Sequence, residues 1–194
     1  MVVGWEDCVL GNQTDIYIPM QTDGHELCHP LDLSGLAAIE TLINGTRRSA
    51  SWQPIAIQIV GQDRRGKLEP SDSPWLGAHA LIFRPSALDV MGPLLHPHGE
   101  HLPLRCEQDQ LWVFNPTCVV DALDPAASVV QRFRDGQIWG VSKYAFRARA
   151  IVGLDVFKIS TLPVSPTFVT GRIVERWSRA GLRGVEFCKV WSPR

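Results

Sequence analysis

The sequence predicts an α+β fold built mostly from an antiparallel sheet of short strands, with a few short helices. Three observations support this class. Apolar residues alternate in many short runs, which Gly, Pro and Asp separate. Few stretches have helical spacing, and no strand–helix–strand rhythm repeats along the chain, so an all-parallel sheet is not indicated. The chain nevertheless ends in a single strand–helix–strand unit, which we predict from Phe168 to Trp191.

This C-terminal unit is the clearest local pattern. Thr170 follows a short apolar run, and its hydroxyl is suited to accept from the unpaired backbone N–H groups of a first helical turn. Gly181 is placed to end the helix in the left-handed conformation, and alternation from Val185 to Trp191 then predicts a strand. The apolar stripe of the predicted helix consists of Ile173, Val174, Trp177 and Ala180.

The front of the chain contains shorter and weaker patterns. They predict a strand at 15–18 closed by Pro19, a loop at 21–30, a helix capped by Asp32 or Ser34 that stops at Asn44-Gly45, a strand with Ile55, Ile57 and Ile59 on one face, and a surface loop at 64–74.

The middle of the chain alternates strands with turn signals. The patterns predict a strand at 80–83, a helix that opens at Pro85 and is broken near Gly92-Pro93, a loop at 96–100, paired strands at 102–106 and 111–114, a hairpin of 129–133 and 137–146 around Asp135-Gly136, and strands at 156–159 and 167–169.

The totals predict one domain. A chain of 194 residues buries enough surface to fold without a disulfide or a metal. We expect a single domain over 1–194, with a looser N-terminal portion at 1–73 and a motif-bearing portion at 74–194. The five Cys are an odd number without a C-x-x-C pair, which indicates reduced thiols. We find neither a signal-peptide pattern nor a membrane span, so we expect a cytoplasmic protein without membrane contact.

Charge is distributed unevenly along the chain. Up to Val130 the sequence has 7 Lys and Arg against 16 Asp and Glu, and from Gln131 onward it has 12 against 4. The two halves either neutralise each other in the fold, or they offer an acidic surface to a basic partner or a basic one to nucleic acid. The sequence does not decide between these alternatives.

Three histidines in one short segment are the main candidate for chemistry. His96, His98 and His101, with a carboxylate and a thiol nearby, include ligand types for zinc, which would suit a metal-dependent hydrolase. Pro97 and Gly99 give the segment no regular face, and the H-E-x-x-H spacing is absent. We therefore favour a structural or solvated loop, and we expect no cofactor, no metal site and no catalytic residue.

Basic residues in the C-terminal unit are the second candidate. Arg172, Arg176, Arg179 and Arg183 recur at helical spacing, as in a surface that contacts phosphates. An ordinary amphipathic helix with its charged side in water has the same pattern. We favour this second interpretation and expect no nucleic-acid partner.

An ordered series of short motifs in the back of the chain resembles a known family. The series includes 99–104, 111–116, 119–124, 157–159, 165–169 and 181–187. These segments resemble a family of bacterial immunity proteins that are encoded beside polymorphic toxins, a family named for a myxobacterial member. The resemblance covers about residues 74–191.

The resemblance implies a function without catalysis. Members are taken to be intracellular antidotes that bind a cognate toxin encoded nearby. It implies an immunity protein that binds this toxin and neutralises it by occlusion, and no catalytic residue is carried over. We expect the motif aromatics to pack in the core, and we expect the interface on loops such as 64–74 or 96–100. The partner-binding residues and the oligomeric state stay unknown at this point.

Overall fold

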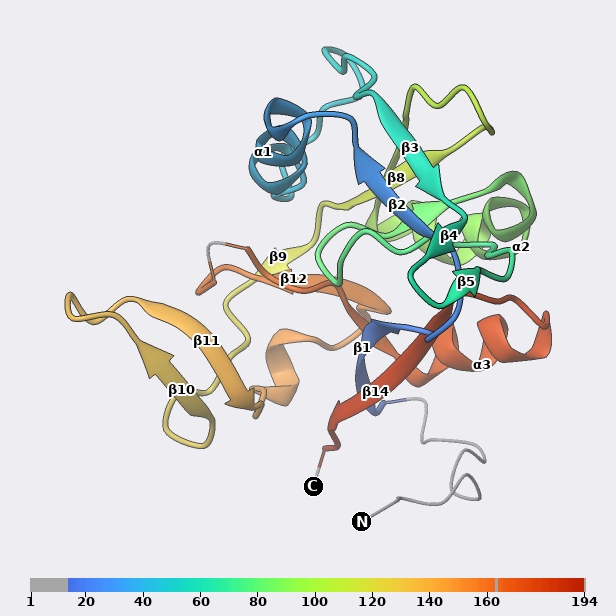
Figure 1. Cartoon of the computed structure of the whole chain (residues 1–194). Helices are drawn as coiled ribbons and strands as arrows, with labels where there is room; N and C mark the ends of the chain where they lie inside the picture. The colour runs from blue at the N-terminus through green and yellow to red at the C-terminus, as the bar shows by residue number, and fades with distance from the viewer. Residues whose placement is uncertain (1–13, 163, 194) are drawn as a thin grey trace.

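The architecture comes from a computed structural model that describes residues 14–162 and 164–193. The strands form a five-stranded sheet, a three-stranded sheet and two-stranded pairs. Figure 1 shows how they are arranged with the short helices. The strands are β1 (Ile16–Gln21), β2 (Leu27–Pro30), β3 (Ile57–Val60), β4 (Gln62–Asp63), β5 (Gly66–Lys67), β6 (Ile82–Phe83), β7 (Gly99–Pro103), β8 (Trp112–Pro116), β9 (Val119–Val120), β10 (Val129–Arg132), β11 (Ile138–Lys143), β12 (Val156–Ile159), β13 (Phe168–Thr170) and β14 (Val185–Trp191). The helices are α1 (Leu33–Leu42), α2 (Pro85–Leu95) and α3 (Gly171–Arg179), with 3-10 turns η2 (His96–His98) and η3 (Ala148–Ala150).

The five-stranded sheet joins the two ends of the described chain. Its order is β14-β1-β13-β12-β9, so β1 lies between two strands from the far end of the sequence. The pairings are antiparallel except for that of β9 with β12, which is parallel. Together with the short helices, this arrangement confirms the predicted α+β class with mostly antiparallel strands.

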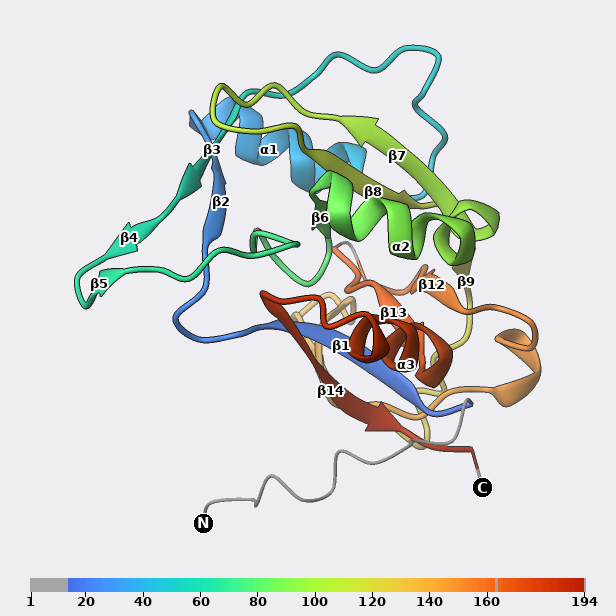
Figure 2. The same ribbon diagram turned by 90° about the vertical axis from the view of Figure 1, so that its right-hand side faces the viewer.

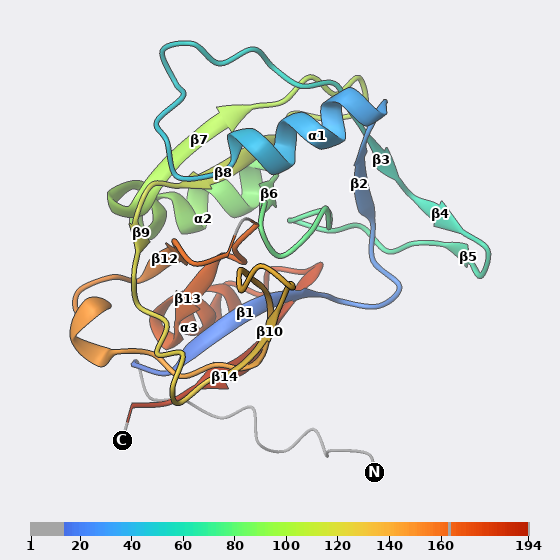
Figure 3. The ribbon, with the colours of Figure 1, turned by 90° about the vertical axis from the view of Figure 1, so that its left-hand side faces the viewer.

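Alternating side chains give the five-stranded sheet two covered faces. Tyr17 and Val169 pack in a cluster with α2 and α3, whereas Ile16 and Phe168 point into a second cluster on the other face. The β10–β11 pair contributes Ile138 to this second cluster. Figures 2 and 3 show α3 over one face of the sheet and β10–β11 over the opposite face.

The three-stranded sheet has the order β6-β8-β7 and uses the same principle. Val113 of β8 packs in a third cluster with Ile39 of α1, whereas its neighbour Phe114 packs in the α2 and α3 cluster. The sheet therefore lies between α1 and α2. No helix within residues 14–162 and 164–193 has the length and apolar character needed to cross a bilayer.

The C-terminal strand–helix–strand unit is confirmed, with two differences of detail. Gly181 follows the helix at φ +66°, as predicted. The Thr170 hydroxyl accepts no backbone N–H of α3 and so does not cap it; it donates to the Asp155 Oδ1 at 2.8 Å, and the Gly171 N–H donates to the Asp15 carbonyl instead. Ala180 is exposed, since α3 ends at Arg179, so the buried stripe is shorter than predicted.

Two predictions for the front of the chain are wrong because tertiary pairing extends the strands. Pro19 does not close β1, which continues along β14 to Gln21 after β13 has stopped pairing at Tyr17. The predicted loop at 21–30 contains β2, which pairs with β3 and buries Cys28 in the third cluster. Asp32 is the cap of α1, where its carboxylate accepts from the Gly35 N–H at 2.7 Å.

Three predictions for turns and loops also need correction. The helix at Pro85 is not broken at Pro93, because burial of Met91 and Leu95 against the core offsets the lost backbone bond. The segment 96–100 is a 3-10 turn followed by the start of β7, and it is largely buried. The segment 64–74 is exposed only in its first part, since Ser71 and Ser73 are buried.

The predicted hairpins are confirmed. β7 pairs with β8, and β10 pairs with β11 around a turn in which Gly136 has φ +87°. The described cysteines, 28, 106, 118 and 188, are free thiols, as expected; Cys8 lies outside the described residues.

Candidate functional site

The structure does not bring the three predicted histidines to one point. His101 lies in an aromatic cluster, with ring centroids 5.2 Å from His96 and 5.0 Å from Phe114. Both of its ring nitrogens are buried without a hydrogen-bond partner among the described residues. Burial, assisted by His96, lowers the pKa of His101 to about 4, so the ring is neutral at pH 7.

His98 faces away from this cluster. Its Nε2 accepts from the Asp155 backbone N–H at 3.4 Å, and its Nδ1 lies 4.0 Å from the Cys118 Sγ. Burial lowers the pKa of His98, while Asp155 acts in the opposite direction. Within residues 14–162 and 164–193, no group of three or more His, Cys, Asp or Glu is arranged to hold a metal ion. In the structure, His101 packs against aromatic rings and His98 accepts a backbone hydrogen bond.

The basic face of the C-terminal helix is partly neutralised. Arg172 pairs with Asp155 at 2.8 Å, and Arg179 pairs with Glu175 at 2.5 Å one turn away. Arg176 donates its Nε to the Val90 carbonyl at 3.4 Å, which directs it toward α2. The four arginines do not form the continuous cationic row that the sequence spacing allowed.

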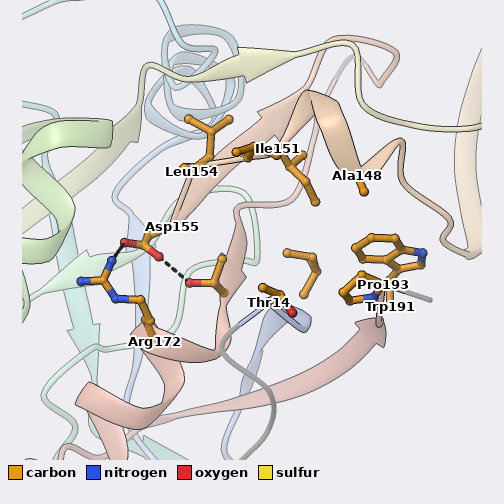
Figure 4. Close-up of a pocket in the computed structure, with 12 residues that line it drawn as sticks. Thr14, Ala148, Ile151, Leu154, Asp155, Arg172, Trp191 and Pro193 are labelled. Atoms are coloured by element: carbon orange, nitrogen blue, oxygen red, sulfur yellow. Dashed lines mark hydrogen bonds and ion pairs between the residues drawn. The ribbon is translucent and has the colours of Figure 1, made fainter.

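A pocket of about 340 Å³ opens beside the start of α3 and the end of β14 (Figure 4). Its polar end holds the carboxylate of Asp155, which accepts from Thr170 and pairs with Arg172, and the remaining walls are mainly apolar. The described lining residues include no Ser, Cys, His or Lys. The pocket is therefore shaped to hold a side chain or a small apolar group, and its polar groups come from Thr14, Asp155, Thr170 and Arg172. Its apolar walls include Ile16, Ile151, Val152, Leu154, Trp191 and Pro193.

A second feature stands out on the opposite side of the β10–β11 pair from the core. Phe133 and Trp139 are 55% and 53% exposed, and their ring centroids lie 6.2 Å apart. Val129 is 53% exposed as well. Large apolar side chains that gather on a surface indicate an interaction site more often than scattered ones do.

Two cations lie on the same hairpin as this aromatic pair. Arg134 follows Phe133 in the chain, and Lys143 is the cross-strand partner of Val129. We use the name outer hairpin surface for Val129, Phe133, Arg134, Trp139 and Lys143. Among the described residues, neither of its two cations forms an ion pair with Asp or Glu.

Comparison with known proteins is informative at this point. Residues 102–192 match the model of an immunity protein family (Imm11). The match confirms the resemblance to an immunity protein family that the short motifs indicate. The matched segment contains the whole outer hairpin surface and most of the pocket lining. No curated protein matches the chain.

The motifs that carried the resemblance are core elements, whereas the candidate surface lies elsewhere. Among the motif aromatics, which were expected in the core, Phe114, Phe157 and Phe168 are fully buried, whereas Trp112 and Phe187 are only partly buried. Phe133 and Trp139 lie on the hairpin that Asp135-Gly136 predicts, but sequence reasoning did not single them out. Ile138 points into the core, and this position determines which face of the hairpin is exposed.

Proposed function

We propose that this chain is an immunity protein that binds a cognate polymorphic toxin encoded nearby and neutralises it by occlusion, in the cytoplasm and without catalysis of its own. The observation that carries the proposal is the match of residues 102–192 to the immunity protein family. An antidote of this kind needs a rigid surface and no reaction centre. Covering the working cleft of a toxin typically buries about 1,600 Å² in total.

The geometry is compatible with a binding role. The candidate histidine ligands do not converge, and the pocket beside α3 and β14 is mainly apolar. The outer hairpin surface combines aromatic and basic side chains, which are enriched among residues that dominate binding energy. These features support a module whose output is a complex with another protein.

Co-expression with the toxin domain encoded next to the gene tests the proposal. We expect this chain to restore growth of cells that produce that domain, and we expect the two proteins to co-purify. An inactive variant of the same domain and a toxin domain from an unrelated locus are the controls. Restored growth should be specific to the neighbouring domain.

The contrary results are equally concrete. Turnover of a substrate by the purified chain, or a neighbouring domain that stays unbound and fully toxic, would contradict the proposal. Stoichiometric zinc that is lost in a variant with His96→Ala, His98→Ala and His101→Ala would favour the hydrolase instead.

A further inference from the structure

One face of the β10–β11 pair packs against the core, and the other face is exposed. Ile138 is buried, and Val130 and Val141 pack against the same cluster, so the hairpin is held in place from within. Phe133 and Trp139 are more than half exposed and are not among the residues that pack in that cluster. A Trp and a Phe that lie side by side at the surface with tilted rings are costly to hydrate unless a partner covers them.

The segment around this pair has a positive net charge. Residues 129–149 contain five Lys and Arg and a single Asp. The Asp135 carboxylate accepts from the Gln137 N–H, and the nearby Asp124 carboxylate accepts from backbone N–H groups at 126 and 127. Arg147 pairs with Asp121 at 2.6 Å. Among the described residues, Arg134, Lys143 and Arg149 have no acidic partner.

Neutralisation between the two halves of the chain does not remove this charge. Two of the Lys and Arg ion pairs among the described residues join the acidic front to the basic back, Arg147 with Asp121 and Lys189 with Asp15. The other Lys and Arg pairs stay within one half. The hairpin therefore keeps a positive field that attracts an acidic surface.

We infer that the outer hairpin surface is the toxin-contacting surface, and that the toxin meets it with an apolar depression bordered by Asp and Glu. This inference rests on the proposed function and deepens it. Trp139 and Phe133 serve as the central anchors, which the toxin shields from water. Arg134 and Lys143 form the rim that orients the approaching toxin.

Two other occupants fit the observations less well. A second copy of this chain would bring two clusters of the same charge together, which opposes association. Nucleic acid also favours cations and aromatic rings, but it needs ring faces that are open to stacking. Here the two rings are tilted at an interplanar angle of 47° with centroids 6.2 Å apart, so they do not offer parallel faces on which successive bases could stack.

The test measures affinity for the purified toxin domain encoded next to the gene, made inactive by substitution in its own site. The aromatic variant carries Phe133→Ser and Trp139→Ser, and the charge variant carries Arg134→Glu and Lys143→Glu. Two matched controls lie outside the family match: Leu33→Ser, which removes an 84% exposed apolar side chain, and Arg64→Glu, which reverses an exposed cation. Thermal unfolding confirms that each variant is folded.

We expect the aromatic variant to raise the Kd at least about 30-fold, as loss of central anchors does. The charge variant should lower the association rate at low salt about tenfold. Both controls should bind as the unaltered chain does. Binding by the aromatic variant within about threefold of the unaltered chain would overturn the inference, while the proposed function would stand because the complex still forms.

The remaining outcomes also decide. If a mixed-sequence 20-nucleotide single strand binds through Phe133 and Trp139 while toxin affinity is unchanged, the surface belongs to nucleic acid and the inference fails. Self-association that the aromatic variant abolishes, with toxin binding intact, assigns the surface to a second copy. If the unaltered chain does not bind the neighbouring domain at all, the proposed function fails, and the inference fails with it.

Discussion

Lys158 is the most unusual single residue of the fold, because it is a lysine with only 3% exposure inside a strand. Its Nζ donates to the carbonyl oxygens of His79 at 2.8 Å and Ser165 at 3.0 Å. No carboxylate is among these partners. Burial lowers the pKa of Lys158 to about 7, so folding favours the neutral amine.

This depressed pKa makes stability depend on pH in a predictable direction. The unfolded lysine holds its proton up to about pH 10.4, whereas the folded one releases it near 7, so stability rises with pH inside that window. We expect the free energy of unfolding to increase by on the order of 1 kcal/mol from pH 7 to pH 8.5, measured with urea. The rise should disappear in Lys158→Met; a rise of the same size in that variant would contradict the assignment.

The sequence pattern does not predict that Lys158 is buried. In the run from Val156 to Ile159, a lysine between apolar residues indicates a strand with one face in water. The backbone carbonyls of His79 and Ser165, which make burial tolerable, come from segments before and after this strand. Contacts of this kind are set by the assembled fold, and the local pattern does not contain them.

At the scale of elements, the turn into β14 leaves the least room for a side chain among the described glycines. Gly184 has φ +99°, and a Cβ placed there would lie 1.6 Å from the Ser71 Oγ and 2.6 Å from the Ser71 Cβ. The backbone also bonds across this junction, from the Asp72 N–H to the Arg183 carbonyl at 3.0 Å. The end of the segment 64–74, which we predicted to be a surface loop, therefore packs tightly against the C-terminal unit.

We expect Gly184→Ala to lower the free energy of unfolding by about 2–4 kcal/mol, because left-handed strain and a steric clash add. The matched control is Gly24→Ala, at φ +77° with open space around the Cβ position, which should cost only about 1 kcal/mol. Urea unfolding measures both. Equal losses in the two variants would show that the contact with Ser71 contributes nothing.

Elements with a strong local signal were predictable, and elements that depend on distant partners were not. Asp135-Gly136 predicted the β10–β11 hairpin, and Gly181 predicted the end of α3, because both signals act within a few residues. The strand at 27–30 was missed because its partner is β3, about thirty residues later. Pro93 was given too much weight, since burial of its helix neighbours decides the outcome.

At the scale of the whole molecule, the position of β1 constrains how the chain can be divided. This strand belongs to the predicted N-terminal portion, 1–73, but it lies between β13 and β14 of the motif-bearing portion. Removing β1 would split the five-stranded sheet. It would also expose the residues of the second cluster against which Ile16 and Ile18 pack. The predicted division into two portions is open to a direct test.

We expect a fragment of residues 74–194 to show no cooperative unfolding by urea, because its sheet lacks the strand that joins β13 to β14. Addition of a separately produced fragment 1–73 should restore a cooperative transition, with the full chain as reference. A fragment 74–194 that unfolds cooperatively by itself would show that β1 is dispensable.

The sequence predicted the kind of function but not the residues of the candidate site. The short motifs indicated an immunity protein, and the same motifs supply core residues such as Phe157 and Phe168. A binding surface is defined by which side chains the packed core leaves outside. For Phe133 and Trp139, that depends on the orientation of the whole hairpin against the sheet, which no local pattern specifies.

The pairing of β1 with β14 also has a consequence during translation. Lys189 and Asp15, which form an ion pair at 3.4 Å, lie 174 positions apart. Because β1 is synthesised long before β14, the five-stranded sheet can close only after β14 has left the ribosome. Under the proposed function, we therefore expect a copy of the chain to protect the cell only after β14 has been synthesised.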